Sequence, residues 1–150
     1  MDSKAEHGST VGARLEHVST QSLHLAWQTI LPGLKLVQRR NASHWIVEDV
    51  YAAIRNNQSS IHLAKLDDYY AGFVVLTPIQ GWDGLNLHIW CAYAIGGYDP
   101  MDAFLPEIER LAHECKARRI TFWSSRAWAR DGRILAHGFK VNQTEFIKEI

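Results

Sequence analysis

Cysteine is scarce in this chain. It has only Cys91 and Cys115 in 150 residues, with no Cys-x-x-Cys pair and no Cys/His cluster at metal-ligand spacing. This predicts two buried free thiols, no disulfide framework and no metal site. The sequence also lacks an apolar run long enough to span a bilayer and an apolar stretch typical of a signal peptide. We therefore expect a cytoplasmic protein that binds no membrane.

The chain also lacks net charge, because 16 basic residues balance 16 acidic ones. A surface that holds nucleic acid by its phosphates is therefore not predicted. Hydrophobic residues make up 47% of the chain, enough for one core at this length. We predict a single domain over residues 21–150. Residues 1–20 are expected to form a polar tail, which could bind a protein partner or another copy of the chain.

Two helices are predicted at the start of the domain. Apolar residues recur at three- and four-residue steps over 23–34 and again over 46–54, as on the buried face of a helix. Pro32-Gly33 is expected to break or kink the first helix, and residues 41–43 offer caps for the second.

Three strands are expected next, over Ser60–Leu66, 70–76 and 85–95. The first alternates along its length, the second is almost wholly apolar and β-branched or aromatic, and Pro78 is expected to close the second. Because the connections between them are short, they predict an antiparallel meander.

The remaining pattern alternates helix and strand. Asp99 and Pro100 suit the cap and first position of a helix, and a strand is expected over 119–124, parallel to the strand over 85–95. A helix from Ser125 to a terminating Gly138 and a last strand over 139–150 follow. We predict an α/β protein with a mixed, mainly antiparallel sheet and helices on both faces.

This element order, with the ending Gly138-Phe139-Lys140-Val141 after a helix, resembles the GNAT (N-acetyltransferase) superfamily. A narrower likeness is to short, divergent GNAT-like proteins of tailed bacteriophages. It rests on Glu48-Asp49-Val50, the Gly-Gly pair after the third strand, the Leu-Pro-Glu-Ile-Glu helix and the segment over 126–130.

The resemblance implies where acetyl-CoA would bind: between two parallel strands, with its pyrophosphate on the backbone N–H groups of the loop that enters the next helix. The candidate cofactor residues it gives are Ile95, Gly96, Gly97, Tyr98, Arg126 and Arg130. The same glycines could instead form an ordinary tight turn, and the arginines a solvated helix face.

Two residues depart from the superfamily pattern. Asp99 places a carboxylate where the loop is usually basic, and Ile134 stands where many members have a tyrosine that protonates the departing thiolate. We therefore predict a non-catalytic structural or interaction protein without a cofactor, such as a phage virion or assembly component.

The alternative is a divergent N-acetyltransferase that uses acetyl-CoA, with its catalytic residues unknown. His62 and His88 each fall in the middle of an expected strand. Either one is a structural residue or, if it faces a cleft, a possible base.

Overall fold

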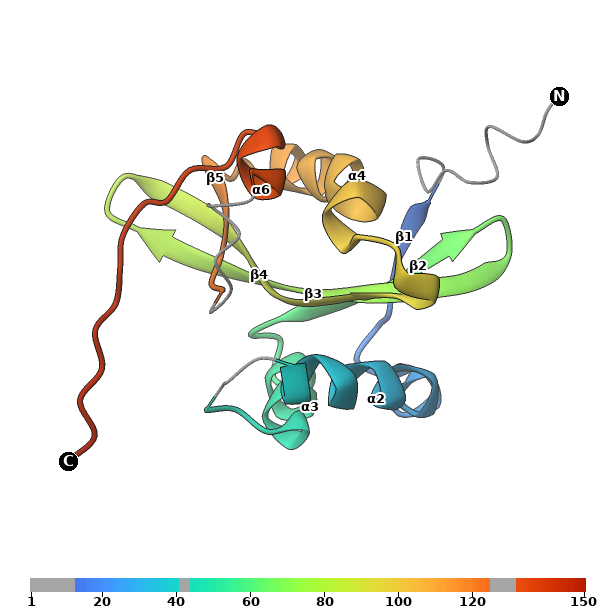
Figure 1. Ribbon diagram of the computed structural model, residues 1–150. Coiled ribbons are helices and arrows are strands. Elements are labelled where there is room, and N and C mark those ends of the chain that lie inside the picture. The colour runs from blue at the N-terminus through green and yellow to red at the C-terminus, as the bar shows by residue number, and fades with distance from the viewer. Residues whose placement is uncertain (1–12, 41–43, 125–131) are drawn as a thin grey trace, which may run out of the picture.

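The computed structural model describes residues 13–40, 44–124 and 132–150 (Figure 1). Its centre is a five-stranded sheet in the order β1-β2-β3-β4-β5. The first four strands are antiparallel neighbours and β5 runs parallel to β4, so the predicted mixed, mainly antiparallel sheet is confirmed. The strands are β1 (Arg14–His17), β2 (Ser60–Leu66), β3 (Tyr69–Gly81), β4 (Gly84–Ala94) and β5 (Arg119–Phe122).

Helices cover both faces of the sheet, as predicted (Figure 1). On one face lie α2 (Leu23–Arg40) and α3 (Val47–Arg55), and on the other lie α4 (Pro100–Glu114) and the short α6 (Arg133–Ala136). The 3-10 turn η1 (Ile95–Gly97) joins β4 to α4.

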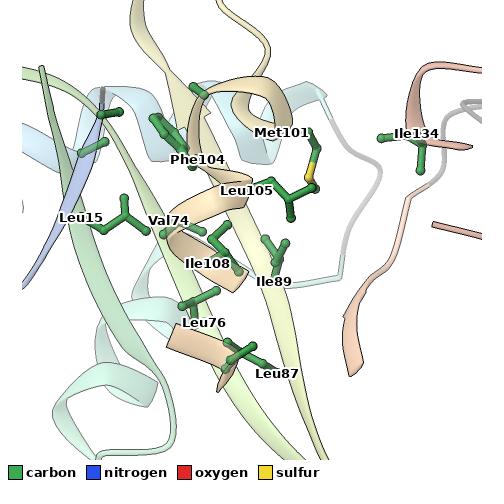
Figure 2. Close-up of a cluster of buried hydrophobic side chains, with 14 residues drawn as sticks. Leu15, Val74, Leu76, Leu87, Ile89, Met101, Phe104, Leu105, Ile108 and Ile134 are labelled. Carbon is green, nitrogen blue, oxygen red and sulfur yellow. The ribbon is translucent and has the colours of Figure 1, made fainter. Parts of the chain in front are cut away.

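Strand alternation gives the sheet an apolar core on each side. Val74 and Leu76 pack against α4 (Figure 2), whereas Phe73 and Val75 pack against α2 and α3. All four side chains are at most 2% exposed. Burying a side chain of this kind stabilises the fold by about 1.5–3 kcal/mol.

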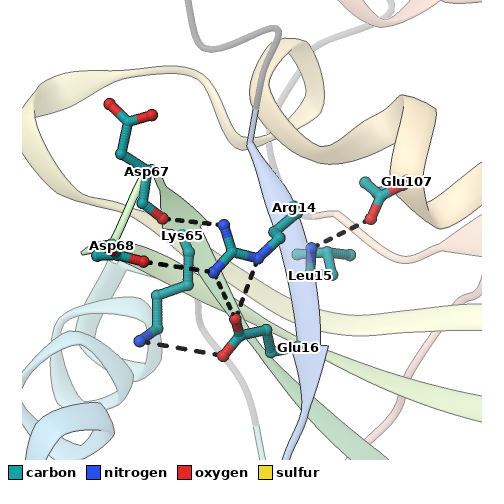
Figure 3. Close-up of polar contacts among 7 residues, drawn as sticks. All are labelled: Arg14, Leu15, Glu16, Lys65, Asp67, Asp68 and Glu107. Atoms are coloured by element: carbon teal, nitrogen blue, oxygen red, sulfur yellow. Dashed lines mark hydrogen bonds and ion pairs between the residues drawn. The ribbon is translucent and has the colours of Figure 1, made fainter.

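Part of the expected polar tail is the edge strand β1. Leu15 pairs with Ala64 of β2, and its backbone N–H donates to Oε1 of Glu107 in α4 at 3.2 Å (Figure 3). Arg14 donates to the backbone carbonyl of Asp67 at 2.9 Å, and Leu15 and Val18 are both buried. The tail prediction is therefore wrong for residues 14–17, where alternation over only four residues is too short to stand out.

Two prolines expected to end elements lie inside them. Helix α2 continues through Pro32, since the burial of Ile30 and Leu34 on its inner face offsets a proline cost of about 3 kcal/mol. Strand β3 continues through Pro78, which pairs with Leu87 of β4 but lies beyond the last β2 partner. The absence of an N–H group at Pro78 therefore removes no hydrogen bond between β3 and β2.

The predicted last strand is wrong, because residues 139–150 contain neither strand nor helix. Phe139 packs on Phe122 of β5 with ring centroids 5.1 Å apart, and the chain then leaves the sheet (Figure 1). Phe146 and Ile147 are adjacent, so they would point to opposite faces of any strand, and both are exposed.

The two cysteines differ. Cys91 is buried, as predicted, and burial raises the pKa of its thiol. Cys115 is exposed at the C-terminal end of α4, so the prediction of a buried thiol is wrong there.

Candidate functional site

The parallel strands β4 and β5 pair over only four residues. Their register runs from Asn86–Arg119 to Ile89–Phe122, and β4 then continues to Ala94 without a β5 partner. The crossover between them is helix α4, as expected for a parallel pair. The two strands thus separate beyond Ile89, and we call this place the separation point.

A β-bulge in β4 lies at the separation point. Val75 of β3 pairs with Cys91 and Leu76 pairs with Ile89, which leaves Trp90 as the extra residue. Ile89 packs on the α4 side, while both Trp90 and Cys91 pack on the α2–α3 side. The bulge therefore turns two consecutive side chains to one face and bends the strand where its parallel partner ends.

The contiguous cofactor candidates follow at the end of β4. Ile95, Gly96 and Gly97 form η1, and Tyr98 leads into α4. Gly96 has a φ of 81°, a backbone conformation that glycine adopts without strain. Ile95 and Tyr98 are 40% and 42% exposed. Arg126 and Arg130 lie outside the described residues.

Negative charge lies at the N-terminus of α4. Asp99 is the N-cap, as predicted, and its Oδ1 accepts from the backbone N–H of Met101 at 3.0 Å. Oδ1 of Asp102 lies 2.8 Å from Nε2 of His137, a contact that connects α4 to the end of α6. Ligand atoms of Asp99, Asp102 and His137 lie within 4.8 Å of one another. Both carboxylates oppose an anion at this helix terminus.

Ile134 is 8% exposed and belongs to the core on the α4 side (Figure 2). This position therefore packs the core and has no proton to donate. A different group must protonate a thiolate if the chain catalyses acyl transfer.

His88 lies in β4 one residue before the separation point. It lies in β4 opposite Thr121 of β5, and its Nδ1 is 2.8 Å from the Thr121 hydroxyl oxygen. Its ring contacts the indole of Trp123, with centroids 4.6 Å apart. Burial lowers the pKa of His88, so its imidazole is neutral at pH 7.

Neither Thr121 nor Trp123 was predicted from the sequence as a site residue. They lie 33 and 35 positions from His88, and only the register of β5 against β4 brings them to it. The parallel pairing predicted for these strands was the available signal, but it does not fix a register.

His62 has a structural environment. It lies in β2 with Nε2 3.0 Å from the hydroxyl oxygen of Ser60, and its ring centroid is 5.3 Å from that of His17. Burial, with smaller effects of His17 and Arg110, lowers its pKa to about 4. It lies two strands away from β4, so the structure does not bring it together with His88.

Two cavities in the described part of the chain lie elsewhere. One, of about 160 Å³, is lined by residues of β1, α3, β2 and β3 and the segments next to them, and the other, of about 470 Å³, is lined by α2 alone. Neither contains a cofactor candidate. Among the described helices, none combines the length and apolar character that crossing a membrane requires.

Known proteins match this chain by structure only. No family model and no curated protein sequence matches it. A ribosomal-protein-alanine N-acetyltransferase from Brucella melitensis superposes with a TM-score of 0.65 at 12% identity, covering 92% of this chain and 99% of that one. A GNAT family acetyltransferase from Staphylococcus aureus gives 0.61 at 9% identity, covering 93% and 99%.

An aminoglycoside N-acetyltransferase in complex with CoA gives a TM-score of 0.58 at 12% identity, covering 92% of this chain and 94% of that one. These matches contradict our preference for a non-catalytic structural protein without a cofactor, because the similar structures are named as acetyltransferases and one contains CoA. The prediction gave more weight to Asp99 and Ile134, which differ from the superfamily pattern, than to the order of helices and strands, which agrees with it. The chain has the fold of the GNAT acetyltransferases.

Proposed function

We propose that this chain is an acetyl-CoA-dependent N-acetyltransferase. The observation that carries the proposal is the separation point: a parallel strand pair ends at a bulge, and the free part of β4 leads through a glycine turn into the N-terminus of α4. Ligands of open α/β sheets bind beyond the carboxyl ends of parallel strands. The fold shared with named acetyltransferases supports the same assignment.

The residues at this place fit the cofactor in backbone geometry. Gly96 brings no side chain to η1, and the turn stands directly before α4, where backbone N–H groups and the helix dipole favour a phosphate. Ile95 and Tyr98 flank it as exposed apolar and aromatic surface. When bound, acetyl-CoA supplies the activated acetyl group.

The charged side chains at the N-terminus of α4 fit the cofactor less well than the backbone does. Asp99 already accepts from the N–H of Met101, and Asp102 adds a second carboxylate in the first turn of the helix. Both repel a pyrophosphate. We therefore expect acetyl-CoA to bind with a Kd in the upper micromolar range or weaker, in the order of 10⁻⁴ M.

Calorimetric titration of the full chain with acetyl-CoA tests the proposal, with Gly96→Ala as the site variant. Gly132→Ala is the matched control, because Gly132 has a φ of 78° against 81° for Gly96, so both substitutions add similar backbone strain. We expect wild type and Gly132→Ala to bind, and Gly96→Ala to bind roughly tenfold more weakly. If wild type shows no heat of binding at millimolar acetyl-CoA, the proposed function is wrong.

Finer features of the protein remain proposals from the sequence. A closer relationship to phage GNAT-like proteins is supported by Glu48-Asp49-Val50 and the Leu-Pro-Glu-Ile-Glu helix. A cytoplasmic location is supported by the exposed free thiol of Cys115, which suits a reducing compartment. A protein partner or a second copy could bind residues 1–20, but the backbone of Arg14–His17 on the β2 side is not free for it, because these residues already pair with β2.

A further inference from the structure

The side chains around His88 point to a role for it in the proposed reaction. Leu87 and Ile89 both belong to the core on the α4 side, so strand alternation directs His88 to the α2–α3 side of the sheet. Thr121 lies between Ile120 and Phe122, which also pack on the α4 side, and it meets His88 on the opposite side.

Tryptophans flank His88 on this face. Trp123 contacts the imidazole and is 81% exposed, although a large indole is normally buried. Trp90 lies on the same face by strand alternation, two residues further along β4 and about 7 Å away. It is held from behind by Trp45, whose ring centroid is 5.8 Å from its own.

We propose that His88 is the proton acceptor for the amine substrate, and that Trp90 and Trp123 form the wall against which a primary amine with an apolar or aromatic body binds. This inference rests on the proposed function. Two features of the geometry support it: His88 stands one residue before the last β4–β5 pair, next to the free part of β4, and the exposed Trp123 covers its ring.

The hydrogen bond with Thr121 fixes the imidazole. This bond is made by Nδ1, so Nε2 is the ring nitrogen that would meet the substrate. This hydrogen bond has two possible directions. If the Thr121 hydroxyl donates to Nδ1, the ring proton lies on Nε2. If Nδ1 donates to the hydroxyl, Nε2 has the lone pair that a base needs. The proposal requires the second arrangement, in which the Thr121 hydroxyl accepts from Nδ1, and in it Thr121 acts as a positioning residue.

The chemical step balances with these groups. Nε2 of His88 takes one proton from the ammonium form of the substrate, which frees the nitrogen lone pair. That lone pair forms the C–N bond at the thioester carbonyl carbon, the C–S bond breaks, and the electron pair leaves on the CoA sulfur. The sulfur takes up a second proton from the nitrogen, and His88 returns its proton to solvent.

The charges around His88 set the substrate class. Its cross-strand neighbours are the uncharged Thr77 of β3 and Thr121 of β5, and among the described residues burial is the cause of its lowered pKa. A polycationic acceptor needs carboxylates for its other amines. An aromatic surface instead suits a single cationic amine on an apolar body.

The test measures release of CoA thiol by the full chain with acetyl-CoA, across pH 5–9, using 2-phenylethylamine, tryptamine and kanamycin as acceptors. The variants are His88→Asn and Thr121→Val. Asparagine places a side-chain amide near the position of Nδ1, so it keeps a partner for Thr121 while removing Nε2. His24→Asn, at an exposed position of α2, is the control for loss of a histidine.

We expect His88→Asn to lower kcat/KM roughly a hundredfold, the usual contribution of a general base, with the Kd of acetyl-CoA unchanged. Because burial lowers the pKa of His88, wild type should lose activity only at a pH below the ordinary histidine range, where His88 becomes protonated, and this acid limb should be absent in His88→Asn. Thr121→Val should lower kcat with little change in KM. The two aromatic amines should exceed kanamycin in kcat/KM by about tenfold or more.

Each other outcome has a defined meaning. If acetyl-CoA does not bind, the proposed function fails and this inference fails with it. If acetyl-CoA binds but His88→Asn keeps the rate and the acid limb, His88 is not the base while the proposed function stands. Acetylation of kanamycin alone, or of none of the three amines, overturns the substrate class.

Discussion

Oδ1 of Asp99 accepts a hydrogen bond from the backbone N–H of Met101 at 3.0 Å, so a carboxylate of the chain itself occupies the N-terminus of α4. This contact stabilises the helix start in the same way that a bound anion would. The position that favours a phosphate in the fold is thus partly satisfied before any ligand arrives.

Asp99→Asn is therefore expected to tighten acetyl-CoA binding. Asparagine caps a helix as well as aspartate does, so the fold keeps its cap while one negative charge is removed. Loss of this repulsion should be worth about 1 kcal/mol, or roughly a fivefold lower Kd by calorimetry. Glu109→Gln, further along α4 and exposed, removes the same charge and should change the Kd little. Equal Kd values for Asp99→Asn and wild type would show that Asp99 does not face the ligand.

Leu15 should contribute to stability as a core residue, although it lies in the segment where the sequence predicted a tail. It is 8% exposed, whereas Leu25 on the outer face of α2 is 72% exposed. Leu15→Ala should lower the free energy of unfolding by about 2–4 kcal/mol, and Leu25→Ala by less than about 0.5 kcal/mol. Urea denaturation of both variants measures this difference. Similar losses at the two positions would mean that β1 is not part of the fold.

The buried His62 should make stability depend on pH. Its pKa is about 4 in the folded chain and 6.5 when unperturbed, so between these values the unfolded state binds a proton that the folded state does not. Stability should thus be constant above about pH 6.5 and fall as the pH is lowered towards 4, by on the order of 3 kcal/mol. His17 and Arg110 add to the penalty, since both place positive charge near the ring at low pH.

His62→Gln should flatten this part of the stability profile, as measured by urea denaturation at several pH values. His24→Gln, at an exposed position of α2, should leave the profile unchanged. A profile that still falls by the same amount in His62→Gln would assign the titration to other groups.

The sequence predicted those features that local pattern encodes. Apolar patterns located α2, α3 and the meander, and Asp99 and Pro100 located the start of α4. Features that depend on distant partners were missed. The helix tolerates Pro32 because its neighbours are buried, and β3 tolerates Pro78 because this residue lies beyond the end of the pairing with β2. Thr121 contacts His88 only because of the register of β5 against β4. The function was misjudged because two residues were given more weight than the whole element order.

The approach of α2 to β4 depends on Gly33. A Cβ atom at this position would lie 2.6 and 2.8 Å from Cδ2 and Cε2 of Tyr93, closer than carbon atoms approach without displacement. The ring cannot easily move aside, because it stacks on Phe73 with centroids 5.8 Å apart. Alanine gains about 1 kcal/mol over glycine in a helix, but overpacking costs typically 1–3 kcal/mol.

We therefore expect Gly33→Ala to lower the free energy of unfolding by up to about 2 kcal/mol, despite the gain in helix propensity. The clash needs the Tyr93 ring, so in a Tyr93→Leu background the same change should be neutral or stabilising through helix propensity. A double-mutant cycle by urea denaturation isolates this coupling between Gly33 and Tyr93. Strictly additive losses would show that α2 does not pack on Tyr93 at this distance, since the penalty of the new methyl group would then be independent of the ring.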